Sequence, residues 1–253
     1  MHYFSQNKQI FLTEVDSTNA EAWRLLEKGT IGEGWTLWAG IQTAGRGQRG
    51  TAWHAAPGQD LTASVVIRPT HLGAGHYFLL SMVVALSALE AAQLFLPARA
   101  GTIQLKWPND LVLGYRKLGG ILIENHWQGR LWQWAIGGLG LNLGQTAFPE
   151  GLTATSLRLA GADTVPYRLL LAWLDALNVW YAYSLPGLQD ELVSAYHNHL
   201  LGMDSWQLYR KPGENPFCGK VEGVSLDGQL RLRRRSGRSL RFGFKEIQWL
   251  GPA

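Results

Sequence analysis

The sequence predicts an α+β protein in which a mixed β-sheet is flanked by helices and followed by a small all-β unit. Strand-like and helix-like hydrophobic patterns are interspersed up to Gly202, whereas only short strand-like segments separated by turn dipeptides follow it. The 253 residues are 46% hydrophobic and 17% charged, which suffices for one large core and argues against disorder. We therefore expect two domains, residues 1–202 and residues 203–253.

The first domain is expected to open with a strand and a capped helix. Thr18-Asn19-Ala20-Glu21 matches a capping box with Thr18 as the N-cap, and Gly29 follows the last helical residue. Residues 77–95 form an apolar stretch interrupted by serine, glutamate and glutamine, which indicates a buried helix rather than a membrane span. Further helices are expected at residues 169–181 and 190–200, and strands at residues 10–15, 35–42, 61–67, 103–107, 111–113, 120–125 and, as one long strand or a pair, 131–143.

Residues 205–250 contain short strands only. Asp227-Gly228 and Ser236-Gly237 are typical of hairpin turns, and this spacing predicts a small β-barrel. Six arginines between residues 231 and 241 give this domain a basic strand face, which we interpret as a solvated surface.

Composition excludes several classes of protein. Cys218 is the single cysteine, so an internal disulfide and a cysteine-based zinc site are excluded. The N-terminus lacks a cationic stretch followed by an apolar run, so we expect a cytoplasmic protein without a secretory signal or a membrane span. The net charge of +4 and the pI of about 9.3 suit an anionic ligand, a nucleic acid or an acidic protein partner.

A glycine-rich loop at residues 42–50 follows a predicted strand. Its glycines let backbone N–H groups close on a ligand, and Arg46 and Arg49 suit phosphate or carboxylate groups. An anion-binding loop and a surface loop with solvated arginines are both compatible with this pattern.

Three further segments combine charge with close backbone approach. Residues 106–110 (Lys-Trp-Pro-Asn-Asp) form a turn, common in itself, whose Lys106 and Asp110 can orient a phosphate and its magnesium. Lys117 precedes two glycines at the mouth of an apolar strand, where its ammonium can meet an anion or lie in water. Residues 137–143 are glycine-rich but open no helix, so they are not a dinucleotide fingerprint.

In this order the segments resemble the motifs of the biotin protein ligases. The family's Ser-Thr-Asn corresponds to residues 17–19, and its Gln-Thr-x-Gly-Arg-Gly to residues 42–47. Lys-Trp-Pro-Asn-Asp is unchanged at residues 106–110, Lys-x-x-Gly-Ile-Leu-x-Glu falls at residues 117–124, and Gly-x-Gly-x-Asn falls at residues 138–142. The resemblance implies a class II synthetase-like catalytic domain followed by an SH3-like β-barrel, the latter on a looser match.

The resemblance also implies an activity. Such ligases join biotin to ATP as biotinyl-5′-AMP and pass the biotin to a lysine of a biotin carboxyl carrier protein. A carboxylate is already a nucleophile, so positioning and charge stabilisation should dominate, with Lys117 and Arg46 as the catalytic residues and Asp110 as a helper for the magnesium of Mg-ATP. The implied biotin contacts are Ser17, Thr18, Asn19, Gln42, Arg46, Gly47, Gln48, Lys117 and Gly120. The implied ATP and adenylate contacts are Arg46, Arg49, Trp53, Lys106, Asn109, Asp110, Gly138 and Asn142.

The chain departs from the family pattern in two respects. Many members carry arginines where this chain has Gln48 and Thr51, so two positive charges are missing near the expected adenylate. The stretch before Ser17 has no room for a helix-turn-helix, so we do not expect DNA binding. Thr18 and Trp53 also have purely structural interpretations, as a helix cap and as a core aromatic.

Two other functions stay open at the level of sequence. One is a lipoate or octanoate ligase of the same fold, and the other is a non-catalytic biotin-binding regulator. The intact residues 106–110, with Arg46 and Lys117, favour the biotin ligase. His197 and His199 point apart on a helix, so we do not expect a metal site there. The oligomeric state is open, with a homodimer as one option.

Overall fold

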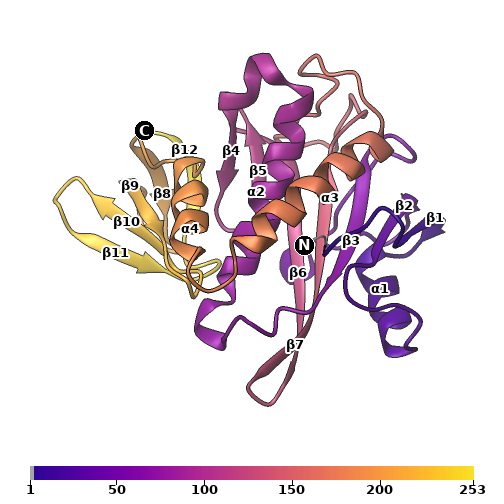
Figure 1. The fold of residues 1–253 in the computed structure, drawn as a ribbon. Coiled ribbons are helices and arrows are strands. Elements are labelled where there is room, and N and C mark those ends of the chain that lie inside the picture. Colours follow the sequence, from indigo (N-terminus) through magenta and orange to yellow (C-terminus); the bar gives the residue numbers. More distant parts are fainter. Residues whose placement is uncertain (1–2) are drawn as a thin grey trace.

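The computed structural model describes residues 3–253, apart from the side chains of residues 49, 97 and 100. The strands of its larger sheet are β1 (Gln9–Val15), β2 (Thr36–Gln42), β3 (Leu61–Ile67), β4 (Ile103–Lys106), β5 (Asp110–Leu113), β6 (Arg116–Gln128) and β7 (Leu131–Leu141). They lie in the order β1-β2-β3-β7-β6-β5-β4, with β1 and β2 parallel and the other neighbours antiparallel (Figure 1). The glycine-interrupted residues 131–143 therefore form one strand and not a pair.

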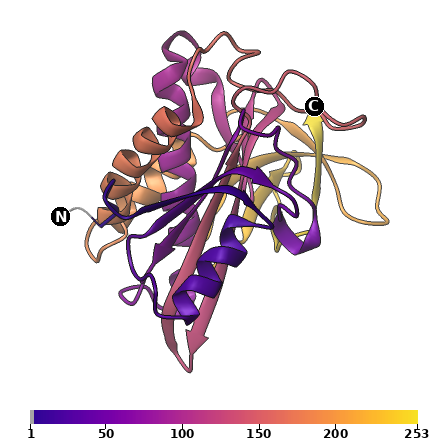
Figure 2. The same cartoon turned by 90° about the vertical axis from the view of Figure 1, so that its right-hand side faces the viewer.

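Helices cover both faces of this sheet. Figure 2 shows α1 (Thr18–Glu27) on one face, and α2 (Phe78–Phe95) and α3 (Pro166–Ala182) together on the other. Because it is covered from both sides, β3 is buried along its whole length. Its alternate residues Leu61, Ala63, Val65 and Ile67 belong to the core that contains α2, while Val66 packs with Ala22 of α1. The remaining helical segments are α4 (Gln189–Asn198) and the 3-10 turns η1 (Gln48–Gly50), η2 (Ala74–His76) and η3 (Pro97–Thr102).

Helix α2 accounts for the most apolar stretch of the chain. Together with the preceding turn, Ala74–Phe95 is the one helix in the described residues that is long and apolar enough to cross a membrane. Of its most apolar window, 72% is buried inside the protein. The Trp173 indole of α3 donates a 3.0 Å hydrogen bond to the Ser87 hydroxyl, so a polar group within α2 is satisfied internally. These contacts agree with a core helix.

The predicted capping box at the start of α1 is wrong. The N-cap is Ser17, and among the described residues it makes no side-chain cap bond. The Thr18 backbone N–H instead donates to Gln42 Oε1 at 2.7 Å, and the Glu21 carboxylate pairs with Arg24 at 2.6 Å. A side chain from β2 therefore satisfies the helix terminus, which a local sequence rule cannot anticipate.

The C-terminal residues form a second sheet, of the strands β8 (Gln207–Arg210), β9 (Phe217–Val224), β10 (Leu230–Arg234), β11 (Ser239–Phe242) and β12 (Gln248–Pro252). Their order is β11-β10-β9-β8-β12, so hydrogen bonding in the described chain leaves β11 and β12 as edges of an open five-stranded sheet. The two predicted turns are present, with φ of 81° at Gly228 and 84° at Gly237. The division into residues 1–202 and 203–253 stays a prediction.

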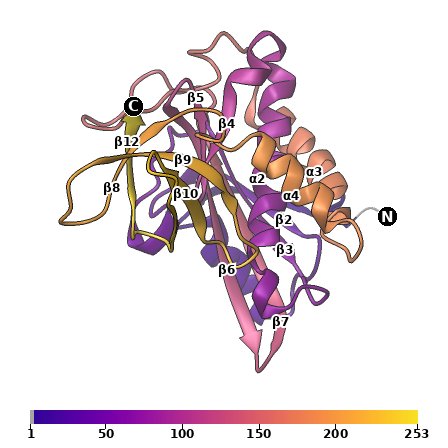
Figure 3. The ribbon, with the colours of Figure 1, turned by 90° about the vertical axis from the view of Figure 1, so that its left-hand side faces the viewer.

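The second sheet lies against the first domain beside β4 and β5 (Figures 1 and 3). The Phe78 N–H donates to Leu226 O at 3.1 Å, and the Trp107 indole donates to Gly228 O at 3.0 Å. Buried residues of both sheets belong to one continuous core. The C-terminal sheet is thus positioned to complete a site that begins on the first domain.

Candidate active site

One cavity of about 440 Å³ collects residues from all the motifs singled out in the sequence. Its walls come from the start of α1, the loop after β2, the β4–β5 turn, β6, β7 and the C-terminal sheet. The expected site residues that line it are Ser17, Thr18, Asn19, Gln42, Arg46, Gly47, Gln48, Trp53, Lys106, Asn109, Asp110, Lys117, Gly120 and Gly138. Two expected residues are not among them: the Arg49 side chain lies outside the described part of the structure, and Asn142 is treated below.

A buried polar network fixes the end of the cavity formed by α1. The Gln42 amide oxygen accepts from the Thr18 N–H at 2.7 Å and from the Thr18 hydroxyl at 3.1 Å. Asn19 donates to Glu124 Oε2 at 2.9 Å, and its own Oδ1 accepts from the Ser64 hydroxyl at 2.6 Å. These bonds hold the side chains in fixed orientations, so the network presents positioned polar groups at this end of the cavity.

Ser64 is a member of this network that the sequence analysis missed. It lies on β3, is fully buried, and also lies 2.7 Å from the Thr18 hydroxyl. A serine in a strand of β-branched residues gives no sequence signal of its own. Its position behind Thr18 and Asn19 makes it a positioning residue.

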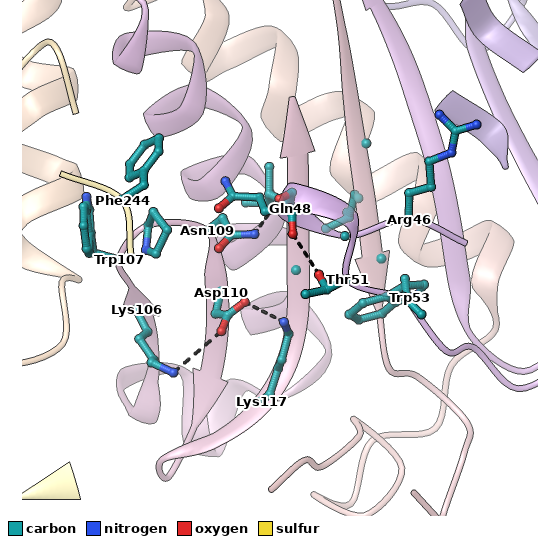
Figure 4. Close-up of a pocket in the computed structure, with 18 of the residues that line it drawn as sticks. Arg46, Gln48, Thr51, Trp53, Lys106, Trp107, Asn109, Asp110, Lys117 and Phe244 are labelled. Atoms are coloured by element: carbon teal, nitrogen blue, oxygen red, sulfur yellow. Dashed lines mark hydrogen bonds and ion pairs between the residues drawn. The ribbon is translucent and has the colours of Figure 1, made fainter. Parts of the chain in front are cut away.

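Asp110 holds two of the three lysines that line the cavity. Its carboxylate lies 2.7 Å from Lys117 Nζ and 3.7 Å from Lys106 Nζ (Figure 4). The arrangement follows from the sheet, because Asp110 on β5 is paired with both β4 and β6. Asn109 next to it donates to Ile121 O at 2.8 Å and accepts from the Ile121 N–H, which fixes the turn. Two ammonium groups beside one carboxylate leave an excess of positive charge for an anionic ligand.

The glycine loop folds back on itself. The Gly47 N–H donates to Thr51 O at 2.7 Å, and the Trp53 N–H donates to Gly45 O at 3.0 Å. Figure 4 shows Arg46 pointing away from the pair of Asp110 and Lys117. Its guanidinium is half exposed and lies 4.0 Å from the Glu124 carboxylate. The two residues expected to act together, Arg46 and Lys117, are therefore on the same cavity but have separate partners.

Trp53 forms a wall of the cavity between the loop and β7. A side chain at Gly140 would place its Cβ 2.3 Å from Trp53 Cε2, so only glycine admits the ring there. Lys117 Nζ lies 5.7 Å from the ring centroid. The indole Nε1 is buried and has no partner among the described residues. The Trp53 ring thus packs against the sheet, as expected of a core aromatic. It also lines the cavity, as expected of a ligand contact.

Asn142 lies behind the cavity and does not line it in the described structure. Its side-chain amide donates to Thr155 O at 3.0 Å and to Lys117 O at 3.3 Å, and its Oδ1 accepts from Gln145 at 2.9 Å. The hydrogen-bonding groups of this side chain are therefore engaged with the protein, and it holds the backbone of Lys117 in place.

The C-terminal sheet contributes lining residues that the sequence analysis did not identify. Trp249 stacks on Tyr115 with 5.9 Å between centroids, and Lys106 Nζ lies 5.0 Å from the Trp249 ring. Phe244 packs on Trp107 at 5.4 Å, as Figure 4 shows. The lining residues from this part of the chain are Leu201, Tyr209, Val221, Leu230, Phe244, Lys245, Ile247, Gln248 and Trp249. More than ninety residues separate most of them from the motifs, so only the fold brings them together.

The His197 side chain has a structural role. His197 Nε2 accepts from the Val224 N–H at 2.9 Å, and burial lowers the pKa of both His197 and His199. No cluster of three or more metal-ligating side chains occurs in the described residues.

The chain is similar in sequence to a known family of protein ligases. Residues 12–142 match the model of the biotin/lipoate A/B protein ligase family. The chain is 40% identical over 132 residues to a biotin–[acetyl-CoA-carboxylase] ligase of Paracoccus denitrificans, a match that spans about half of each protein (52% and 53%). It is 28% identical over 226 residues to the ligase of that name from Mycobacterium tuberculosis, covering 87% of this chain and 81% of the relative.

The fold comparison extends over nearly the whole chain. The biotin protein ligase of Aquifex aeolicus in complex with biotin and ATP superposes with a TM-score of 0.76 at 27% identity, covering 96% of this chain and 99% of that one. This likeness confirms the predicted mixed sheet with flanking helices and a small C-terminal β domain. The predicted closure of that domain into a barrel is not seen, because the hydrogen bonds of the described strands leave an open sheet.

Proposed function

Because the chain belongs to the biotin/lipoate A/B protein ligase family, we propose that it is an ATP-dependent biotin protein ligase. It forms biotinyl-5′-AMP and transfers the biotin to a lysine of a biotin carboxyl carrier protein. The observation that carries the proposal is the convergence of all five motifs on one cavity, with Lys117 at its charged centre. The biotin ligases among its relatives, and the Aquifex aeolicus structure with biotin and ATP, support these substrates.

Biotin is assigned to the end of the cavity formed by α1. Its ureido ring needs a few fixed polar partners, which Thr18, Asn19 and Gln42 offer through their network. Its apolar chain suits the wall formed by Ile121 and Leu139. The carboxylate at the end of that chain then lies toward Lys117. Ser17, Gly47, Gln48 and Gly120 line the same region.

ATP is assigned to the part of the cavity formed by the β4–β5 turn, Trp53 and the C-terminal sheet. An oxygen of the biotin carboxylate attacks the α-phosphorus, the bond to the bridging oxygen breaks, and pyrophosphate leaves with the electron pair. Two anions must approach each other, so the cations Lys117 and Lys106 offset their repulsion. Lys117 exchanges its bond with Asp110 for bonds to the carboxylate and the α-phosphate. Arg46 joins it when the glycine loop closes over the ligand.

The residues present fit a magnesium ion carried by ATP. Asp110 is the one carboxylate among the described lining residues, and Mg²⁺ is usually held by one or two carboxylates together with phosphate oxygens. Asp110 would hold that ion, which would supply charge neutralisation at the phosphates. Release of Asp110 from Lys117 on substrate binding makes its carboxylate available for this role.

In the second step the acceptor lysine attacks the carbonyl of the mixed anhydride and AMP leaves. Closure of the glycine-rich loop, residues 42–50, keeps water from hydrolysing the anhydride first. Biotin carboxyl carrier protein as the acceptor, a cytoplasmic location and the lack of DNA binding remain predictions of this proposal, and the oligomeric state stays open, with a homodimer as one option.

Pyrophosphate release tests the activation step. The purified chain is incubated with Mg-ATP and either biotin or lipoate. We expect release with biotin and little with lipoate. Release with lipoate alone would identify a lipoate ligase, and release with neither would identify a non-catalytic binding protein.

A further inference from the structure

A cation from the C-terminal domain also lines the ligand cavity. The charged side chains among the described lining residues are Arg46, Lys106, Asp110, Lys117 and Lys245. Arg46 has Glu124 within 4.0 Å, and Lys106 and Lys117 share Asp110. In the described chain, Lys245 alone of these cations has no carboxylate within ion-pair distance.

The backbone of Lys245 is in a conformation that normally selects glycine. It occupies the third position of a turn from Gly243 to Glu246, closed by a 3.2 Å bond from the Glu246 N–H to Gly243 O. Its φ is 70°, and Tyr115 is the only other non-glycine residue with a positive φ in the described chain. A lysine here costs about 1 kcal/mol or more relative to glycine. Strained residues of this kind cluster at active sites and at sites that clamp ligands.

Neighbouring contacts fix where this turn lies. Phe244 packs on Trp107 at 5.4 Å and on Phe78 at 6.3 Å. The Glu246 carboxylate accepts from the Gly243 N–H at 2.7 Å, so this carboxylate stabilises the backbone of the turn. Lys245 is therefore anchored beside residues 106–110, and Figure 4 shows Phe244 and Arg46 on opposite sides of the pocket.

Resting on the proposed function, we propose that Lys245 binds the polyphosphate chain of ATP and neutralises the pyrophosphate as it leaves. The glycine loop has the uncharged Gln48 and Thr51 facing the same cavity. Lys106 and Lys117 lie at Asp110, the part of the cavity to which the proposed function assigns the α-phosphate. In this proposal the β- and γ-phosphates extend from there toward Lys245, which supplies positive charge from the C-terminal domain. The C-terminal domain thereby contributes a ligand-binding residue to the nucleotide site.

Binding of three nucleotide fragments to Lys245→Gly tests this role. Glycine removes the ammonium but suits the positive φ, so the variant should fold with an unchanged or higher melting temperature. Dissociation constants for ATP, inorganic triphosphate and AMP are measured by titration calorimetry without biotin. We expect roughly tenfold weaker binding of ATP and triphosphate and unchanged binding of AMP, because a lost contact between charged groups has about this effect. Lys245→Arg should retain most of the affinity.

Arg238→Gly is the matched control, since Arg238 is an exposed cation of the same domain outside the cavity. Its ATP affinity should equal that of the wild type. Unchanged ATP binding in Lys245→Gly would overturn the role of Lys245 and leave the proposed function intact. An equal loss of affinity for AMP and ATP would have the same consequence. A wild-type protein that does not bind ATP would overturn the proposed function and this inference with it.

Discussion

The Lys117 ammonium lies 2.7 Å from the Asp110 carboxylate, across the paired strands β5 and β6. Asp110 is also 3.7 Å from Lys106, so one carboxylate positions the two lysines at the centre of the cavity. A substrate carboxylate or phosphate is negatively charged, as the Asp110 carboxylate is. It can therefore replace Asp110 as the partner of the Lys117 ammonium. The ligand-free arrangement is thus prepared for the anions it has to bring together.

Replacement of Lys117 by methionine should strongly reduce adenylate formation. The variant keeps the length of the side chain but removes the charge that stabilises the transition state, a loss of roughly a hundredfold or more in kcat. Pyrophosphate release with biotin and ATP measures it. Lys211→Met, at an exposed ion pair with Glu214, is the control and should retain full activity. Near-normal rates in Lys117→Met would refute the site assignment.

Gly140→Ala should displace Trp53. The added Cβ would lie 2.3 Å from Trp53 Cε2, and overpacking of this kind costs about 1–3 kcal/mol in free energy of unfolding. ATP binding should weaken as well, because Trp53 forms the wall of the nucleotide region.

Urea denaturation and ATP titration check both effects. Gly75→Ala, which has open space around it, should change neither. In a Trp53→Ala background the cost of Gly140→Ala should largely disappear. An equal cost in both backgrounds would show that the clash with the ring is not its cause.

Ser64→Ala should weaken biotin binding more than ATP binding. The substitution removes the hydroxyl that lies 2.6 Å from Asn19 Oδ1 and leaves that buried oxygen without its donor, at a cost of about 1–3 kcal/mol. The dissociation constants for biotin and ATP are compared by calorimetry, with the exposed Ser239→Ala as control. An equal weakening of both ligands would indicate general destabilisation rather than positioning.

Stability should fall as the pH drops below about 6.5. Burial lowers the pKa of His71, His197 and His199 from the ordinary value of 6.5, so the unfolded chain binds protons that the folded chain rejects. The contribution is complete above pH 6.5 and is lost as the pH falls toward the lowered pKa values. At His197 the backbone hydrogen bond with Val224 acts in the opposite direction, but burial is the larger cause and the pKa is lowered.

Urea denaturation at pH 7.5 and pH 5.5 measures this loss. His197→Gln should reduce it, because the glutamine amide oxygen can accept from Val224 without titrating. His54→Gln, at an exposed site, should leave the loss unchanged. A loss in His197→Gln as large as in the wild type would argue against a role for this ring.

Much of the fold could be predicted from the local pattern of hydrophobic residues. The extent of β3 was predicted to the residue, and α2 and α3 to within a few, because their hydrophobic patterns coincide with burial. The capping box failed because the Thr18 hydroxyl bonds to Gln42, a partner from another strand. Tertiary contacts of this kind outweigh local rules where a helix end is also part of a site.

The sequence identified site residues only where they belong to contiguous motifs. Lys117 and Asp110 belong to such motifs and do meet. Asn142 belongs to one too, yet it points into the structure and holds the backbone of Lys117. Ser64 and Lys245 have no motif around them, since a buried serine and a strained lysine show their role only through their neighbours.

Transfer of biotin to an acceptor protein is the direct test of ligase activity. The purified chain is incubated with Mg-ATP, biotin and a biotin carboxyl carrier protein, and the intact mass of the carrier is measured, with lipoate in a parallel reaction. We expect one added biotinyl group on a single lysine, which depends on ATP and is lost with Lys117→Met. An unmodified carrier in the presence of biotin, or a carrier modified by lipoate instead, would contradict it.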